Sequence, residues 1–439
     1  MTKQPVDNRT VISGTLSRFL GQVDHPTVAI AIEVDDYQQL EEVYENERLQ
    51  SALTFIHSAI EENLTANDVI INLDGARFFA ALAPIGPTTA ETMLNTCTRI
   101  QHALANVTRT TTLPVNLTAS IGFASSGTFV RPTADDLSQA AFAALADAKR
   151  HAPNAVRGYS ASIARRREAQ KKTARDAAAA FERGEIFAYF QPQLNLETGR
   201  LSGFEALARW HHPENGIMAP ADFLPALELA GLMPRLGETM VKQALQALTF
   251  WDKAGLDVPK IGVNFSTSEL RNPRLVDRIS NHLDVGHIAA DRLNIEVLET
   301  VVASKCDDDI TGNLAALADL GCGIDLDDFG TGYASIANIR KFSVKRIKID
   351  RSFVSGIDAD DEQKNMVSAI LTMADRLCVE ALAEGVETRA ERETLRQLGC
   401  HDAQGFQIAR PMPIQETVEW SNVFFAQSAK PIDLTKRAS

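Results

Sequence analysis

Short apolar runs alternate with amphipathic helical stretches over the second half of the chain. The first two runs, FAYFQPQLN and LSGFEALARW, flank the turn residues Glu197, Thr198 and Gly199, as is typical of a hairpin. Six further runs follow about 20 to 40 residues apart: IGVNFS, RLNIEVLE, GCGIDLDDFG, VKRIKID, CVEALAEGVE and HDAQGF. Strands that alternate with helices form parallel sheets, and the segment approaches the ~250 residues of a (β/α)8 barrel. We therefore expect an α/β fold with a TIM-like (β/α)8 barrel over residues 185–425.

The first half of the chain predicts a different domain, of the α+β class, over residues 25–160. A hairpin is expected around Asp74, Gly75 and Ala76, where two apolar runs meet a turn signal. The order of elements indicates helices on one face of an antiparallel sheet. The expected strands cover residues 27–36, 68–84 and 115–125, and the expected helices cover residues 47–64, 89–107 and 134–151.

Three further segments complete the division of the chain. Residues 1–24 are expected to form an N-terminal extension, and residues 426–439 a C-terminal tail. Residues 161–184 are basic at first and then rich in alanine, and they end in Gly184, a residue that often terminates helices. We expect a connecting helix there. It either transmits a signal, contacts an anionic partner, or is simply a solvated connector, as most charged runs are.

Composition narrows the class of protein. The formal net charge of −13 argues against a general nucleic-acid binder, because phosphate neutralisation needs a basic face. The five cysteines show no CxxC spacing, which fits reduced thiols in the cytosol. The N-terminus lacks an apolar signal region, and no apolar run approaches the ~18 residues of a membrane span. We therefore expect a cytoplasmic protein without a nucleic-acid or membrane partner.

Polar side chains stand where the apolar runs of the second half end. The C-terminal ends of barrel strands meet at one mouth, so these side chains should converge. Carboxylates crowded in one cleft repel each other, and divalent cations such as Mg²⁺, Mn²⁺ or Ca²⁺ compensate the repulsion. Two ions that share one aspartate form a phosphoryl-transfer site. The residues concerned are Glu205, Asn264, Glu296, Asp327, Asp328, Lys348, Asp350, Glu384 and Gln404.

A third aspartate of the same run, Asp325, has no place in this scheme. It lies two residues before Asp327 and should therefore also point into the barrel. Two states are open for it. Either it pairs with a lysine or an amide inside the barrel, or it stays protonated.

At these residues the chain resembles the EAL-domain phosphodiesterases of cyclic di-GMP. The resemblance covers residues 187–419 and rests on seven motifs in order: EALARW, NFS, EVLE, DDFGTGYAS, KID, EGVE, and QGF followed by Pro411. It implies that cyclic di-GMP is bound and that one phosphodiester bond of the ring is hydrolysed to give linear pGpG. It also implies two ions, Mg²⁺ or Mn²⁺, per barrel, and a homodimer.

The resemblance further implies a role for each matching residue. The ligands of the first metal would be Glu205, Asn264, Glu296 and Asp327, and those of the second metal would be Asp327, Asp328 and Glu384. The catalytic group would comprise Lys348, which contacts the hydrolytic water, Gln404 beside it, Glu205 and Glu384. The substrate-contacting positions would be Gln191, Leu207 and Arg209, the last on a phosphate. Glu299 would anchor the loop that follows the double aspartate.

Two other functions fit part of the pattern. A receptor or scaffold would bind cyclic di-GMP without cleaving it, and Leu298, where the family usually has threonine, supports that interpretation. No ligand position is lost, however. An enolase-like barrel enzyme would use Lys348 as the base that abstracts a proton. The pair Asp327 and Asp328, with the glycine loop after it, fits phosphoryl chemistry with a shared metal better.

The N-terminal domain resembles, more weakly, a GGDEF diguanylate cyclase domain. Where a cyclase has the letters GGDEF, this chain reads DGARF, so Ala76 and Arg77 replace the acidic pair that binds metal. A cation at that position opposes Mg²⁺ binding. Glu41 replaces an amide that reads guanine, and Thr65 replaces an arginine of the inhibitory site. We therefore expect a degenerate, inactive cyclase domain that regulates, dimerises, binds GTP or a protein partner, or only packs.

Overall fold

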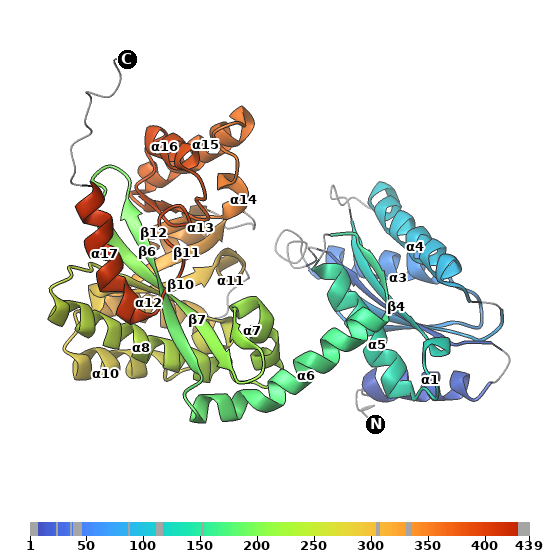
Figure 1. Ribbon diagram of the computed structural model, residues 1–439. Coiled ribbons are helices and arrows are strands. Elements are labelled where there is room, and N and C mark those ends of the chain that lie inside the picture. The colour runs from blue at the N-terminus through green and yellow to red at the C-terminus, as the bar shows by residue number, and fades with distance from the viewer. Residues whose placement is uncertain are drawn as a thin grey trace, which may run out of the picture. The chain divides into compact units, whose positions relative to one another are not determined.

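The computed structural model describes residues 8–22, 25–35, 37, 46–86, 88–110, 117–150, 153–303, 308–330 and 336–428. The chain divides into two compact units, residues 1–171 and residues 172–439 (Figure 1). The division falls within helix α6 (Ala161–Glu182), which lies where the connecting helix is expected. Among the helices described, none combines the length and the hydrophobicity needed to cross a bilayer.

In the described part of the N-terminal unit, five strands form one sheet in the order β2-β3-β1-β4-β5. β1 pairs antiparallel with β3 and β4, and β2 and β3 form the expected hairpin. The edge strand β5 runs parallel to β4 and was not expected from the sequence. The elements are α1 (Asn8–Leu20), β1 (Val28–Val34), α3 (Asn46–Glu61), β2 (Val69–Asp74), β3 (Arg77–Leu82), α4 (Ala90–Thr110), β4 (Ala119–Ser125), α5 (Ala134–Lys149) and β5 (Val156–Gly158).

Helices cover both faces of this sheet, so the expectation of a single covered face is wrong. On one face, Ile30 of β1 packs in a cluster with Ile56 of α3. On the other face, Ala31 packs with Leu16 of α1 and Leu137 of α5. The run VAIAI in β1 is apolar at every position, which is the pattern of a strand buried on both sides.

In the described part of the C-terminal unit, eight strands close into a barrel in the order β6-β7-β9-β10-β11-β12-β13-β14. This confirms the TIM-like barrel, with one difference: β6 runs antiparallel to both of its neighbours, β7 and β14. A short strand, β8, extends the hairpin from β7. The strands are β6 (Ile186–Asn195), β7 (Leu201–His212), β8 (Gly216–Met218), β9 (Ile261–Asn264), β10 (Leu293–Leu298), β11 (Gly323–Phe329), β12 (Arg346–Ile349), β13 (Glu380–Ala383) and β14 (Asp402–Ala403).

Helices surround the barrel strands, and α8, α10 and α12 pack beside one another (Figure 1). Most strands are followed by at least one helix before the next strand begins, as in a (β/α)8 barrel. The helices are α7 (Pro220–Leu229), α8 (Met233–Ala254), α9 (Thr267–Leu270), α10 (Leu275–Gly286), α11 (Glu299–Ala303), α12 (Asp308–Leu320), α13 (Ile336–Lys341), α14 (Arg351–Val354), α15 (Asp361–Leu377), α16 (Arg389–Gln397) and α17 (Ile414–Ser428).

Side chains of successive residues in the barrel strands point alternately to the surrounding helices and to the barrel interior, because side chains alternate along a strand with a period of two. In β10, Ile295 belongs to the apolar cluster beneath the helices, whereas the next residue, Glu296, is buried among polar groups. In β12, Ile347 joins the apolar cluster, and Arg346 and Lys348 on either side of it are fully buried and ion-paired. The barrel interior is therefore filled largely by polar and charged side chains.

Gly122 of β4 allows helix α5 to approach the sheet at backbone contact distance. A Cβ there would lie 1.9 Å from the backbone nitrogen of Leu145 and 2.5 Å from the backbone oxygen of Ala141. We expect Gly122→Ala to destabilise the N-terminal unit by about 1–3 kcal/mol, measured by hydrogen exchange of the β4 amides. Gly14→Ala in α1 is the control, because nothing lies within 4 Å of its added Cβ. Unchanged protection in Gly122→Ala would contradict the close approach.

Glu269 of α9 makes stability depend on pH. Burial raises the pKa of Glu269 from 4.5 to about 7, although Ser266 donates hydrogen bonds to its carboxylate. The folded state thus favours the protonated form. The free energy of unfolding that this protonated carboxyl contributes is fully present below about pH 4.5 and is lost as the pH rises towards 7. Glu269→Gln removes this titration, so urea unfolding should show that the wild type loses stability relative to the variant between about pH 5 and about pH 8. Parallel stability curves would show that Glu269 titrates normally.

Candidate metal centre

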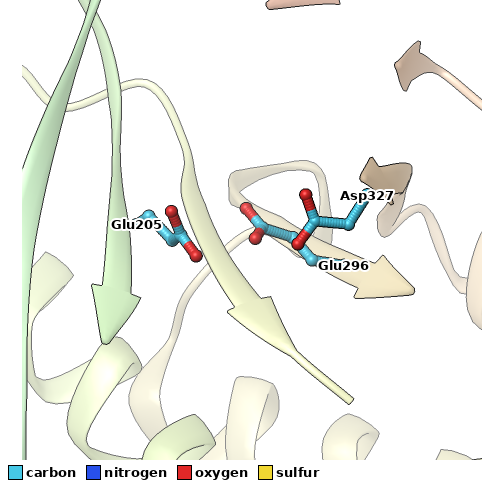
Figure 2. A group of neighbouring side chains, drawn as sticks. All are labelled: Glu205, Glu296 and Asp327. Atoms are coloured by element: carbon cyan, nitrogen blue, oxygen red, sulfur yellow. The ribbon is translucent and has the colours of Figure 1, made fainter. Parts of the chain in front are cut away.

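Polar side chains from successive barrel strands meet at one mouth of the barrel. Figure 2 shows the carboxylates of Glu205, Glu296 and Asp327, which come from β7, β10 and β11, gathered in one space. Asn264 at the end of β9 donates from Nδ2 to Glu205 Oε1 at 2.7 Å and to Glu296 Oε2 at 3.3 Å. The other residues of the mouth are Asp328 of β11, Lys348 of β12, and Glu384 and Gln404 directly after β13 and β14.

The carboxylates form two groups with one member in common. The first group is Glu205, Glu296 and Asp327, and the second is Asp327, Asp328 and Glu384. In each group, one oxygen from every residue lies within 4.8 Å of the others. Asp327 therefore stands between two sets of oxygen atoms, each of a size that could hold a cation.

A local break in β11 allows both neighbouring aspartates to face the mouth. Successive residues of a regular strand point to opposite sides. Here the pairing with β12 shifts register between Leu326 and Phe329, and Asp328 adopts the left-handed conformation with φ of 53°. The Asp328 amide also donates to Asp327 Oδ1 at 3.0 Å. The strained backbone thus brings the Asp328 carboxylate into the second group, beside Asp327, which belongs to both groups.

Lys348 lies at the centre of the carboxylates. Its Nζ is 2.7 Å from Glu296 Oε2, 2.8 Å from Glu384 Oε1, 3.1 Å from Asp327 Oδ1 and 3.7 Å from Glu205 Oε2. Burial disfavours the ammonium, but the surrounding negative charges outweigh burial and raise the pKa of Lys348 well above its usual value. Lys348 is therefore a cation in this site.

The acids of the mouth carry more negative charge than one ammonium can balance. Burial and the charge of Glu205 raise the pKa of Glu296 well above its usual range. Burial raises the pKa of Asp328 to about 6 and that of Glu384 to about 8. Burial acts on Glu205 too, but the ammonium and two amides outweigh it, so the pKa of Glu205 is lowered. Additional positive charge is needed before all of these acids can ionise together.

The residues fit a pair of divalent cations. Among the buried side-chain atoms that the structure describes, Glu296 Oε1 is one of the few without a hydrogen-bond partner. Gly262 makes room for this oxygen, because a Cβ at that position would lie 1.8 Å from it. An unpartnered carboxylate oxygen beside other oxygen donors is what Mg²⁺ or Mn²⁺ requires.

A cleft of about 270 Å³ opens beside the acids. Gln191 and Leu207, two of the expected substrate-contacting residues, line it, but Arg209 does not. Arg209 instead donates to the backbone oxygen of Ala208 at 2.7 Å and lies over the Tyr189 ring. A different arginine, Arg351, lines the cleft, and it was not among the expected substrate-contacting residues. The sequence contains a sign of this position, because Arg351 follows the end of β12 and the strand ends form the mouth.

Glu299 lies at the start of α11 and contacts the loop after β11. The Gly330 amide donates to Glu299 Oε2 at 2.8 Å. Gly330 has a φ of 102°, which favours glycine. The rest of the loop, residues 331–335, lies outside the described residues.

The structure answers the open question of Asp325 partly as expected. Asp325 forms a fully buried ion pair with an arginine, Arg346 of β12, at 2.5 Å. It also accepts hydrogen bonds from the Asn294 amide at 2.9 Å and 3.1 Å. The amide was expected as one alternative, and the guanidinium was not.

Comparison with known protein families gives two matches. A family model described as "EAL domain" matches residues 174–411, and one described as "Diguanylate cyclase, GGDEF domain" matches residues 2–155. The bifunctional diguanylate cyclase/cyclic di-GMP phosphodiesterase MucR of Pseudomonas aeruginosa is 29% identical over 95% of this chain and 60% of MucR. The cyclic di-GMP phosphodiesterase RocR of the same organism is 33% identical over 56% of this chain and 62% of RocR. The chain thus spans less than two thirds of either relative.

Solved structures agree with these matches. The PaMucR phosphodiesterase in complex with c-di-GMP is 34% identical, with a TM-score of 0.54, and covers 56% of this chain and 99% of that chain. A structure of the S helix, GGDEF and EAL segments of Vibrio cholerae LapD has a TM-score of 0.67 and covers 92% of this chain and 95% of that chain. At 18% identity, the LapD structure supports the fold alone.

Because Asp327 belongs to both carboxylate groups, its loss should affect both cations. We expect equilibrium dialysis to find two Mn²⁺ ions per wild-type chain, one in Glu384→Gln and none in Asp327→Asn. Glu387→Gln is the control, since Glu387 lines the same cleft, pairs with Arg351 and belongs to neither group. Binding of Mn²⁺ by Asp327→Asn at the wild-type level would contradict the shared ligand.

Proposed function

The chain belongs to the EAL domain family and carries a GGDEF domain before it, and we propose that it is a metal-dependent phosphodiesterase that hydrolyses cyclic di-GMP to linear pGpG. The observation that supports this most strongly is the pair of carboxylate groups joined by Asp327 around the Lys348 ammonium. The named activities of MucR and RocR point to the same reaction.

Two cations, Mg²⁺ or Mn²⁺, would polarise the scissile phosphate and lower the pKa of the attacking water. The first would be held by Glu205, Asn264, Glu296 and Asp327, and the second by Asp327, Asp328 and Glu384. In the reaction, the oxygen of water forms a bond to phosphorus and the bond from phosphorus to the 3′-oxygen breaks. The 3′-oxygen leaves with a proton, and the ring opens to pGpG.

The other residues of the mouth bind and orient the reactants. The Lys348 ammonium and the Gln404 amide, which lies 2.5 Å from Glu205 Oε2, would position the water. Gln191 and Leu207 would contact the substrate from the wall of the cleft. Arg351 lies in the cleft and can meet a phosphate there, whereas Arg209 would first have to leave Ala208. Glu299 would hold the loop after β11 through Gly330.

A non-catalytic receptor for cyclic di-GMP is the second candidate. Two observations favour it: Arg209 is bonded to the Ala208 backbone and does not line the cleft, and Leu298, at the position where threonine is usual, is 43% exposed. An enolase-like enzyme is less well supported, because it needs a neutral lysine as base and Lys348 is surrounded by carboxylates.

The GGDEF domain is proposed to be an inactive cyclase that regulates or dimerises the protein. In the signature turn, Arg77 donates from Nε to Asp74 Oδ1 at 2.6 Å, and Ala76 is buried. A guanidinium at this turn, where the resemblance to cyclases would have acids for a metal, supports the proposal. GTP or a protein partner could bind this domain, and a homodimer is proposed. Glu41, the changed guanine-reading position, lies outside the described residues.

Incubation of purified protein with cyclic di-GMP and Mg²⁺ or Mn²⁺ tests the proposal, with products followed by chromatography. We expect pGpG to appear, EDTA to abolish it, and Glu205→Ala to lower the rate by at least about a hundredfold. Glu393→Gln serves as the control variant, because Glu393 lies on α16, pairs with Arg396 and does not line the cleft. Binding of cyclic di-GMP without cleavage would establish the receptor instead. Formation of cyclic di-GMP from GTP would contradict the inactive cyclase.

A further inference from the structure

We propose that Arg346 and Gln193, buried beneath the carboxylate groups, are positioning residues that fix the orientation of the Gln404 carboxamide and, through it, the carboxylate of Glu205. The catalytic consequence rests on the phosphodiesterase function proposed above. The effect on metal affinity does not, and it can be measured separately.

A continuous chain of hydrogen bonds links these residues across the barrel interior. Arg346 of β12 donates from Nη1 to Gln193 Oε1 of β6 at 3.0 Å. Gln193 donates from Nε2 to Gln404 Oε1 at 2.8 Å, and Gln404 donates from Nε2 to Glu205 Oε2 at 2.5 Å. At its far end, Arg346 is held by Asp325, to which Nε and Nη2 donate at 2.9 Å and 2.5 Å.

The direction of these hydrogen bonds is set by the groups at the two ends of the series, the Arg346 guanidinium and the Glu205 carboxylate. A guanidinium can only donate, so the carboxamide of Gln193 must turn its oxygen to Arg346 and its NH₂ group to Gln404. Gln404 must then turn its own oxygen to Gln193, which leaves its NH₂ group for the carboxylate of Glu205. The opposite orientation of either amide would bring two donors or two acceptors together.

A second contact imposes the same orientation on Gln404. Gln191 donates from Nε2 to the backbone oxygen of Ala409 at 3.1 Å, and a carbonyl can only accept. Gln191 Oε1 is therefore left to accept from Gln404 Nε2, at 3.0 Å. Two independent contacts thus agree on which end of the Gln404 amide faces Glu205.

Burial makes the orientation costly to reverse. Arg346 and Gln193 are each 1% exposed, Gln404 is 4% exposed and Glu205 is 5% exposed. A misoriented amide inside the barrel would leave donors and acceptors unpaired, which is far more unfavourable than in water. The carboxylate of Glu205 is held at both oxygens, because Asn264 donates to Oε1 and Gln404 to Oε2. Outer partners of this kind commonly change metal affinity by about 10- to 100-fold.

A double-mutant cycle on Mn²⁺ affinity tests the proposal. Gln193→Met, which keeps the length of the side chain, should weaken binding of the ion at Glu205 by about tenfold. In a Gln404→Met background, Gln193→Met should have no further effect, because Gln193 acts through Gln404. An unchanged affinity in Gln193→Met, or an equal loss in both backgrounds, would overturn the proposal.

Asp402→Asn is the matched control. Asp402 Oδ2 also lies 3.6 Å from Arg346 Nη1, but Asp402 does not take part in the series of hydrogen bonds that leads to Gln404. We expect Asp402→Asn to bind Mn²⁺ as the wild type does. A loss of affinity equal to that of Gln193→Met would show that any disturbance of Arg346 suffices, and would overturn the role of the amide chain.

A second variant covers the case in which Gln193→Met does not fold, as judged by thermal unfolding. Gln193→Glu keeps an acceptor for Arg346, but its carboxylate cannot donate to Gln404. The proposal expects weaker Mn²⁺ binding in spite of the added negative charge, and tighter binding would overturn it. If the wild-type protein binds Mn²⁺ but leaves cyclic di-GMP intact, the proposed phosphodiesterase activity is refuted. The double-mutant cycle on Mn²⁺ affinity would still test whether Gln193 positions Gln404.

Discussion

The balance of charge around Lys348 is the constraint on which the barrel mouth depends. One buried ammonium lies within 3.7 Å of four carboxylates, and no arrangement of these five groups alone is neutral when all are ionised. The protein can respond by keeping some acids protonated, and burial raises the pKa of Glu384 and Asp328 accordingly. The alternative response is to bind cations. A site that holds acids in this state is prepared for divalent metals, because binding relieves a repulsion already present.

The two polar layers of the barrel interior differ in how far the chain itself balances their charge. In the lower layer, Asp325 and Arg346 neutralise each other, and the amides of Asn294 and Gln193 hydrogen-bond to them, although Asn294 Oδ1 has no partner among the described residues. In the upper layer, carboxylates exceed cations, and Glu296 Oε1 has no partner in the part of the chain that the structure describes. The charges of Asp325 and Arg346 are thus balanced within the chain and this layer can support the upper one, whose excess of negative charge calls for cations from outside the chain. Gln404 connects the two layers.

Much of this architecture could be predicted from the sequence, because strand periodicity and strand ends carry it. The eight barrel strands and the mouth residues follow from where the apolar runs stop. The convergence of Asp327 and Asp328 does not follow from a period of two, since it depends on the positive φ of Asp328. Arg346, the partner of Asp325, was not predicted, although it lies on the same face of the RIKI strand as Lys348. Helices on both faces of the N-terminal sheet were not expected, although the apolar VAIAI run is the pattern of a strand buried on both sides. The hydrogen bond of Arg209 to the Ala208 backbone, and its absence from the cleft lining, depend on side-chain conformation, which no local pattern shows.

We propose that two cations flank Asp327 and that the substrate phosphate lies against them. The most direct measurement is a crystal structure with Mn²⁺ and cyclic di-GMP, in which anomalous scattering locates the metals. We expect two anomalous peaks, one among Glu205, Asn264, Glu296 and Asp327 and the other among Asp327, Asp328 and Glu384, with a phosphate of the ligand in contact with both. A ligand bound in the cleft with no peak at Asp327 would refute the two-cation site.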